Sequence, residues 1–147
     1  MARIPLVFED QIWVMGSIVI SGIHSAPAIV RFAVDTGSPY TILSLNECRR
    51  LNIPQAILQQ DRQLKLGGTT HYRMLINRKT SLLLRAEDQR IQTFAYDYGI
   101  IFPVAQTRAS IANALSLPSL LGLDFLKDNK LRFVCDAAEG IAYLETA

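Results

Sequence analysis

Cysteine and histidine, the side chains that most often hold metal ions, are scarce in this sequence. The 147 residues include two cysteines, Cys48 and Cys135, and two histidines, His24 and His71. None of them stands at the close spacing of a zinc site, such as a CxxC pair. The sequence therefore predicts no metal and no other cofactor. We expect both cysteines to be reduced thiols in the core, and the sequence alone leaves a disulfide between them open.

Dense charge and long apolar runs are missing as well. The formal net charge is +2, and the lysines and arginines are spread along the chain instead of forming a block. This distribution does not favour a nucleic-acid partner. The apolar run at residues 12–23 is interrupted by glycine and serine and is shorter than the roughly 20 residues of a membrane helix, so we expect a pair of strands there. With no recognisable targeting signal, we expect a cytoplasmic protein without a membrane partner.

Short apolar segments account for most of what is present. Half of the residues are hydrophobic and 19% are charged, which fits one globular domain over residues 1–147. Segments rich in β-branched and aromatic residues alternate with turn residues, a pattern that predicts an all-β barrel or sandwich. The predicted strands are 4–8, 28–34, 80–84, 91–95, 100–104, 131–134 and 141–144.

Two stretches have helical features. Ser44 is followed three residues later by Glu47, which is the pattern of a capping box, and the helix that it starts is expected to stop at Asn52 and Pro54. Residues 106–117 fit a helix or a loop, and residues 55–63 carry no clear pattern.

One acidic residue, Asp35, stands between the apolar runs 28–34 and 40–45. Burying an unpaired carboxylate costs several kcal/mol, so this residue needs an explanation. In the simpler interpretation, Asp35 and Thr36 accept backbone hydrogen bonds in a tight turn, with Gly37 at a positive φ. In the other interpretation the apolar flanks place the turn inside a core, where the acid performs acid–base chemistry.

Two further stretches are informative. Residues 64–76 predict a β-hairpin with a tip that contains Gly67, Gly68 and Thr69, and taken alone this is an ordinary surface hairpin. Residues 120–126 predict a buried strand that ends at Gly122 and a helix that is N-capped by Asp124.

Taken together, these stretches resemble the retropepsin-like aspartic proteases. The active-site loop of that family reads apolar-Asp-Thr-Gly-Ser/Ala, as residues 34–38 do here, and an apolar pair followed by glycine packs beside the loop, as at Leu121-Gly122. Residues 120–126 are closer to the cellular and bacterial members than to the viral ones, which carry an arginine soon after the glycine and use it between subunits. The resemblance implies a closed barrel with a flap hairpin and one or two short helices.

The resemblance also implies an activity, the hydrolysis of peptide bonds. Asp35 is then the catalytic acid, and Thr36, Gly37 and Ser38 support it, with Ser38 as a hydrogen-bond partner of the carboxylate. A single Asp-Thr-Gly supplies half of a site, so a homodimer with Asp35 of each chain at its two-fold axis is implied. Two carboxyl groups about 3 Å apart share one proton, and a water held between them attacks the peptide carbonyl.

The remaining roles concern the flap, the packing and the partners. Gly67, Gly68 and Thr69 are expected at the flap, over a peptide or protein substrate, and His71 or Tyr72 is expected near that substrate. Leu121 and Gly122 pack the loop, and residues 141–144 are expected to add strands to the dimer interface.

Two other interpretations stay open. The same fold and dimer would also suit a peptide-binding or dimerisation module that cleaves nothing. A hydrolase with a Ser/His/Asp triad would use His24 or His71, but the sequence has no Gly-x-Ser-x-Gly elbow.

Overall fold

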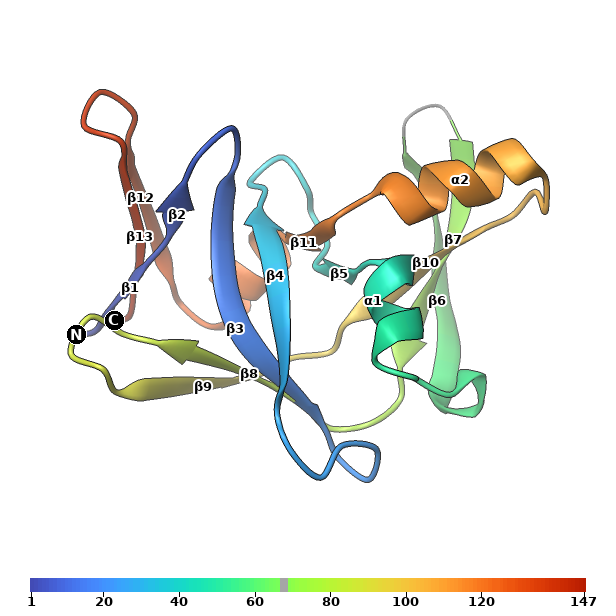
Figure 1. Ribbon diagram of the computed structural model, residues 1–147, viewed down its shortest axis with the longest axis horizontal. Helices are drawn as coiled ribbons and strands as arrows, with labels where there is room; N and C mark the ends of the chain where they lie inside the picture. The colour runs from blue at the N-terminus through green and yellow to red at the C-terminus, as the bar shows by residue number, and fades with distance from the viewer. Residues whose placement is uncertain (67–68) are drawn as a thin grey trace.

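Most of the chain is β-structure that curls around a hydrophobic core (Figure 1). The computed structural model describes residues 1–66 and 69–147. The strands are β1 (Arg3–Pro5), β2 (Val7–Phe8), β3 (Ile12–Ile20), β4 (Ala28–Val34), β5 (Ile42–Leu43), β6 (Leu58–Leu66), β7 (Thr69–Ile76), β8 (Thr80–Arg85), β9 (Ile91–Ala95), β10 (Gly99–Pro103), β11 (Ser119–Leu121), β12 (Arg132–Asp136) and β13 (Ile141–Glu145). The helices are α1 (Leu45–Arg50), a 3-10 turn η1 (Gln55–Ile57), α2 (Arg108–Ser116) and α3 (Leu123–Asp128).

Ten strands form one sheet in the order β6-β7-β10-β5-β11-β4-β3-β8-β9, with β2 paired to β3. The sheet curls into a half-barrel with β6 and β9 at its two ends (Figure 1). The all-β prediction is confirmed at this level, and closure into a full barrel stays a prediction. The described residues hold three α-helices where one or two were expected, because residues 106–117 resolve in favour of α2.

The remaining strands form a small sheet in the order β1-β13-β12, which brings the two termini side by side (Figure 1). Both edges of β13 are therefore paired within the chain. Our expectation that residues 141–144 add strands to a partner is wrong for this segment, because the edges of the small sheet are β1 and β12. The apolar run 12–23 was also misassigned, since β3 continues as one strand from Ile12 to Ile20.

The core lies inside the curl of the large sheet. Phe32 and Tyr98 stack with ring centroids 5.7 Å apart, and Phe94 meets Phe125 edge to face at 5.6 Å. Fully buried aliphatic side chains fill the space around these rings, among them Leu43, Ile100 and Leu121. Phe32, Leu43 and Leu121 belong to β4, β5 and β11, so the three strands around the Asp35 loop are anchored in the core.

The predicted helix start at Ser44 is confirmed, with one difference. Ser44 Oγ accepts a hydrogen bond from Glu47 N at 3.1 Å. The Glu47 carboxylate pairs with Arg50 and does not return to the Ser44 amide, which donates to Ser119 Oγ at 2.8 Å. The helix start is thereby attached to β11, next to the Asp35 loop.

The cysteines have different surroundings. Cys48 is buried in α1, as expected, and Cys135 is exposed on β12; both are free thiols. The expectation of two core thiols is therefore wrong for Cys135, which is exposed on β12, an edge strand of the small sheet. Within residues 1–66 and 69–147, we find no helix with the length and apolar character needed to span a membrane.

Candidate active site

Asp35 lies directly after β4, where that strand pairs in parallel with β11. Its amide donates to the carbonyl of Leu121 at 3.0 Å, which continues the ladder by one residue. The chain then turns: Gly37 N donates to Asp35 Oδ1 at 2.9 Å, and Ser38 N donates to the Asp35 carbonyl at 3.1 Å. The turn holds the carboxylate by a backbone donor, and its second oxygen takes no part in that bond.

The turn lies at the surface of the chain. Asp35 and Ser38 are half-buried, and Thr36 and Gly37 are exposed. Our expectation of a turn inside the core is wrong within a single chain, because the apolar flanks 28–34 and 40–45 enter the core while the turn itself projects from it. Gly37 does not adopt the positive φ that was expected. Its small size matters instead, since a Cβ there would lie 3.1 Å from Asp35 Oδ1.

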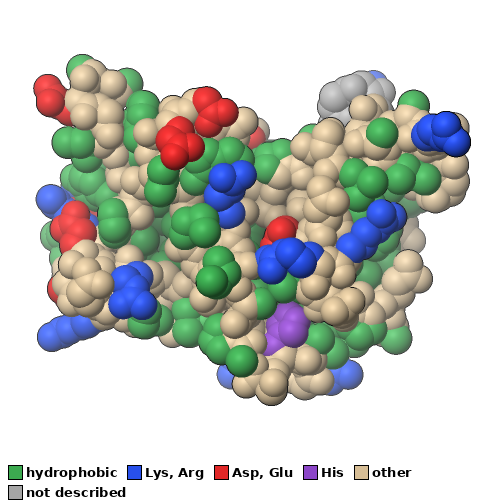
Figure 2. All heavy atoms as spheres, viewed as in Figure 1, with side chains coloured by type: hydrophobic (Ala, Val, Ile, Leu, Met, Phe, Trp, Pro, Cys, Tyr) green, Lys and Arg blue, Asp and Glu red, His purple; other side chains and the backbone are tan. Residues whose placement is uncertain are grey.

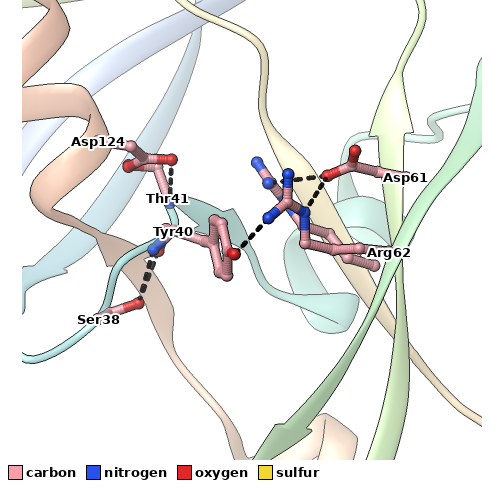
Figure 3. Close-up of polar contacts among 7 residues, drawn as sticks. Ser38, Tyr40, Thr41, Asp61, Arg62 and Asp124 are labelled. Carbon is pink, nitrogen blue, oxygen red and sulfur yellow. Dashed lines mark hydrogen bonds and ion pairs between the residues drawn. The ribbon is translucent and has the colours of Figure 1, made fainter.

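Ser38 has a different partner from the one expected. Its hydroxyl donates to the carbonyl of Tyr40 at 2.7 Å and accepts from the Tyr40 amide at 3.4 Å. The expected hydrogen bond from this hydroxyl to the Asp35 carboxylate is replaced by a local bond within the loop (Figure 3). Ser38 thus stabilises the second half of the loop.

Gly122 lies against this second half. A Cβ on Gly122 would stand 2.5 Å from the Tyr40 carbonyl oxygen, 2.7 Å from its carbon and 2.8 Å from the Ser38 carbonyl oxygen. The next amide, that of Leu123, donates to the Ser38 carbonyl at 2.9 Å. Leu121 and Gly122 therefore contact both halves of the loop with their backbone, and no side chain fits at position 122.

Asp124 has a role that sequence reasoning missed. Gly122, and not Asp124, is the N-cap of α3, and it makes no side-chain cap bond. The Asp124 carboxylate accepts from Thr41 N at 3.1 Å and from Thr41 Oγ1 at 2.7 Å, as Figure 3 shows, and it also accepts from the amide of Phe125 at 2.7 Å. Gly122 N in turn donates to Thr41 Oγ1 at 3.0 Å. The sequence does show Thr41 soon after residues 34–38 and Asp124 soon after Leu121-Gly122. Only the structure shows that these two side chains pair.

The predicted hairpin is present as β6 and β7, with Leu66 opposite Thr69. Gly67 and Gly68 lie outside the described residues, and Thr69 is the first residue of β7. His71 is buried, with 1% of its surface exposed, so the expectation that it lies at the substrate is wrong; burial lowers the pKa of its imidazole. Tyr72 is half-buried on the next position of β7.

A groove of about 710 Å³ begins at Asp35. Its walls are mostly apolar and come from β4 and the segment before β11, and its rim carries the acids of the turn between β2 and β3. Figure 2 shows acidic side chains gathered near the ends of β2, β3 and β4. The lining residues are Phe8, Glu9, Asp10, Gln11, Ile12, Ala33, Val34, Asp35, Leu117, Pro118 and Leu120.

The histidines offer no support for a Ser/His/Asp triad. The His24 ring accepts from Ile20 N at 3.4 Å and lies 3.2 Å from the Leu51 carbonyl, so backbone groups hold both of its nitrogens. His71 is enclosed in the hairpin. Among residues 1–66 and 69–147, no three side chains of His, Cys, Asp or Glu converge as a metal site.

Comparison with solved structures shows that the fold of this chain is similar to a known one. The chain is similar to a retropepsin-like aspartic protease from Rickettsia conorii, with a TM-score of 0.57 and 16% identity over 98% of this chain and 90% of the other. No family model and no curated protein sequence matches the chain. The similarity therefore extends to the fold, and the roles of individual residues depend on the geometry described above.

Proposed function

We propose that this protein is an aspartic endopeptidase in which two copies of the chain form a homodimer and each supplies one Asp35. The observation that carries the proposal is the placement of Asp35: its carboxylate is held by the Gly37 amide, and the residue lines a groove with mostly apolar walls. A retropepsin-like neighbour among solved structures supports a peptidase of this class.

The dimer follows from the number of acids that the chemistry needs. Each chain has one Asp-Thr-Gly, and water activation of this kind uses two carboxyl groups that share a proton. The exposure of Thr36 and Gly37 is consistent with a second copy covering the turn. In the dimer, the Thr36 hydroxyls brace the two loops across the axis, and the pair of curled sheets closes around the substrate.

The mechanism uses the two protonation states of the pair. The ionised carboxylate takes a proton from a bound water, which attacks the carbonyl carbon of the scissile peptide bond. The protonated carboxyl group of the other chain hydrogen-bonds the carbonyl oxygen, and a proton then passes to the leaving amine. Because the shared proton is lost as the pH rises, cleavage is expected to be fastest in mildly to moderately acidic solution.

The hairpin of β6 and β7 serves as the flap in this proposal. Gly67, Gly68 and Thr69 are then the flap residues that contact the peptide. The groove at Asp35 accommodates a side chain next to the scissile bond, since its walls at Ala33 and Leu120 are apolar.

The test is Asp35→Asn, with Asp88→Asn as the matched control. Asp88 is an exposed carboxylate that does not line the groove, and like Asp35 it accepts a hydrogen bond from the amide two residues further along the chain, here Arg90 N at 3.0 Å. We expect a peptide library at pH 3–7 to be cleaved by the wild type and by Asp88→Asn, and cleavage by Asp35→Asn to fall by roughly 10²–10⁴-fold. Pepstatin should inhibit the active proteins.

A mixing experiment tests the shared site. When wild-type and Asp35→Asn subunits exchange, activity should fall more steeply than the wild-type content, because each mixed dimer holds one acid. Activity that falls in proportion to that content contradicts a shared site. A wild type that binds pepstatin but cleaves no peptide supports the alternative function, a peptide-binding or dimerisation module with the same fold.

A further inference from the structure

Tyr40, in the second half of the Asp35 loop, contacts two arginines of the hairpin. The guanidinium carbons of Arg62 and Arg73 are 4.6 Å and 4.9 Å from the centroid of its ring. Arg62 also donates a hydrogen bond to the Tyr40 hydroxyl, as Figure 3 shows. We refer to Tyr40, Asp61, Arg62 and Arg73 as the Tyr40 cluster.

A β-bulge brings the charged members of the cluster together. The register of β6 against β7 shifts between Gln60 and Arg62, which leaves Asp61 as the extra residue and places Arg62 opposite Arg73. Two arginines in direct opposition repel each other across a strand pair. Asp61 offsets this repulsion, since its Oδ2 lies 2.9 Å from an Arg73 nitrogen and 3.3 Å from Arg62 Nε. Bulges of this kind redirect side chains and are frequent beside active sites.

Gly99 gives Arg73 its place. Arg73 is buried, with 5% of its surface exposed, and its side chain lies across Gly99 of β10. A Cβ at position 99 would stand 2.1 Å from Arg73 Nε and 2.7 Å from its Cγ. Glycine at position 99 therefore leaves room for the Arg73 side chain, which a Cβ there would displace from Asp61 and Tyr40.

The two sides of the loop thus have different supports. Gly122 and Asp124 hold the backbone at Tyr40 and Thr41 from the body of the domain. The Tyr40 cluster holds the same segment from the hairpin. Arg62 is half-exposed on the wall of a cavity of about 640 Å³ that Tyr40, Asp61 and Arg73 also line, so it has room to move away from the ring.

We propose that Tyr40 is a positioning residue, and that the Tyr40 cluster couples the hairpin to the loop that carries Asp35. This inference rests on the proposed peptidase function. When Arg62 and Arg73 contact the ring, residues 38–41 are fixed and the turn at Asp35 is held in the arrangement that the reaction needs. When the base of the hairpin shifts, the contact with the ring loosens and the loop is released.

The first measurement is hydrogen exchange of the four backbone amides within residues 37–41, since Pro39 has none, and it does not depend on activity. Arg62→Gln removes one guanidinium from the ring, and Arg50→Gln is its matched control. Arg50 and Arg62 have equally exposed side chains, 50% in each, and each pairs with a neighbouring carboxylate. We expect exchange at residues 37–41 to become about fivefold faster in Arg62→Gln and to stay unchanged in Arg50→Gln.

A second pair of variants separates the ring from the hydroxyl. Tyr40→Phe keeps the stacked ring and loses the bond from Arg62, and Tyr40→Leu loses both. We expect a smaller acceleration of exchange in Tyr40→Phe than in Tyr40→Leu. Gly99→Ala should resemble Tyr40→Leu in this measurement, because it displaces Arg73 without changing any member of the cluster.

The second measurement is kcat for each active site, counted by pepstatin titration. If Tyr40 has a positioning role, Tyr40→Leu should lower kcat about tenfold and change KM less. The loop then holds Asp35 in the geometry of the reaction less often, while the contacts that bind the substrate are unchanged. Unchanged exchange in Arg62→Gln and Tyr40→Leu overturns the coupling. Faster exchange with an unchanged kcat for each titrated site overturns the positioning role and leaves a structural one.

The two proposals fail in different ways. If the wild type cleaves no peptide, the proposed function is refuted and the catalytic role of Tyr40 falls with it. The exchange measurement then still decides whether the hairpin and the loop are coupled.

Discussion

Replacing Gly122 by alanine tests the packing of the Asp35 loop most directly. The Cβ of Gly122→Ala would stand 2.5–2.8 Å from three backbone atoms of Ser38 and Tyr40. Gly122 has φ −95°, which any residue adopts, so the cost is steric and not conformational. Inserting a methyl group into a packed site costs about 1–3 kcal/mol. Because backbone yields less readily than a flexible side chain, we expect the upper end of this range.

A loss of about 3 kcal/mol corresponds to a Tm lower by roughly 6–12 °C, at roughly 2–4 °C for each kcal/mol in a domain near this size. The assay is thermal unfolding at one fixed protein concentration, because the stability of a dimer depends on concentration. The same samples are then assayed for peptide cleavage for each pepstatin-titrated site, well below the Tm.

Gly16→Ala is the control for this experiment. A Cβ on Gly16 would lie 2.6 Å from Leu84 Cδ2 and 2.8 Å from the Leu83 carbonyl oxygen, where β3 lies beside its antiparallel neighbour β8. We expect Gly16→Ala to lose stability and to keep its activity for each titrated site, and Gly122→Ala to lose both. A Tm of Gly122→Ala within 1 °C of wild type would refute the steric reasoning, and a fall in Tm with full activity would refute the link from Gly122 to Asp35.

Two more predictions concern the buried titratable groups. Burial lowers the pKa of His71, so the folded state binds a proton at this imidazole less readily than the unfolded state. The free energy of unfolding is therefore unaffected by His71 protonation above about pH 6.5, and it falls as the pH drops below that value, by at most about 1.4 kcal/mol for each pH unit. The free energy of unfolding, measured with urea, should therefore depend less steeply on pH between about 4 and 6.5 in His71→Leu than in wild type. Equal slopes would contradict a contribution of His71 to this pH dependence. Burial also raises the pKa of the Cys48 thiol, whereas Cys135 is exposed, so a thiol reagent at pH 8 should label Cys135 within minutes and Cys48 only on unfolding. In Cys135→Ser the fast phase should vanish, and a fast phase that persists would contradict the burial of Cys48.

Local patterns in the sequence predicted the elements whose causes are themselves local. The N-cap at Ser44 depends on a hydroxyl and an amide three residues apart, and the structure contains that bond. The strand runs were visible because β-branched residues separated by turns have few other arrangements. The turn at Asp35 was visible because an acid between two core segments has few ordinary reasons to be there.

The errors occurred where a local pattern had a competitor far away in the sequence. Asp124 has the spacing of an N-cap, but Gly122 holds that position, and the Asp124 carboxylate accepts from the amide and hydroxyl of Thr41 as well as from the amide of Phe125. Ser38 has the position of a carboxylate partner, but its hydroxyl donates to the Tyr40 carbonyl. These competing bonds depend on how β5, β11 and α3 meet, which no spacing along the chain reveals.

The Tyr40 cluster lay further beyond prediction, because it requires a register. A regular pairing of β6 with β7 would turn Asp61 and Arg62 to opposite faces, and the bulge lets Asp61 pair with Arg73 while Arg62 reaches the ring of Tyr40. The requirement for glycine at position 99 cannot be seen in the sequence, because it depends on the Arg73 side chain lying across that residue in the fold.

The support of Asp35 is unevenly distributed along its loop. The first half, residues 35–37, is held by one ladder bond to Leu121 and by its own turn, and it faces solvent in the single chain. The second half, residues 38–41, carries the other contacts from distant parts of the chain, at Ser38, Tyr40 and Thr41. An acid that must meet its counterpart from another subunit needs an open face, and that face cannot also carry the packing that fixes its position. Placing the anchors three to six residues further along the chain satisfies both requirements, so changes at Gly122, Asp124 or Arg62 should reach Asp35 through the backbone of the loop and not by contact with it.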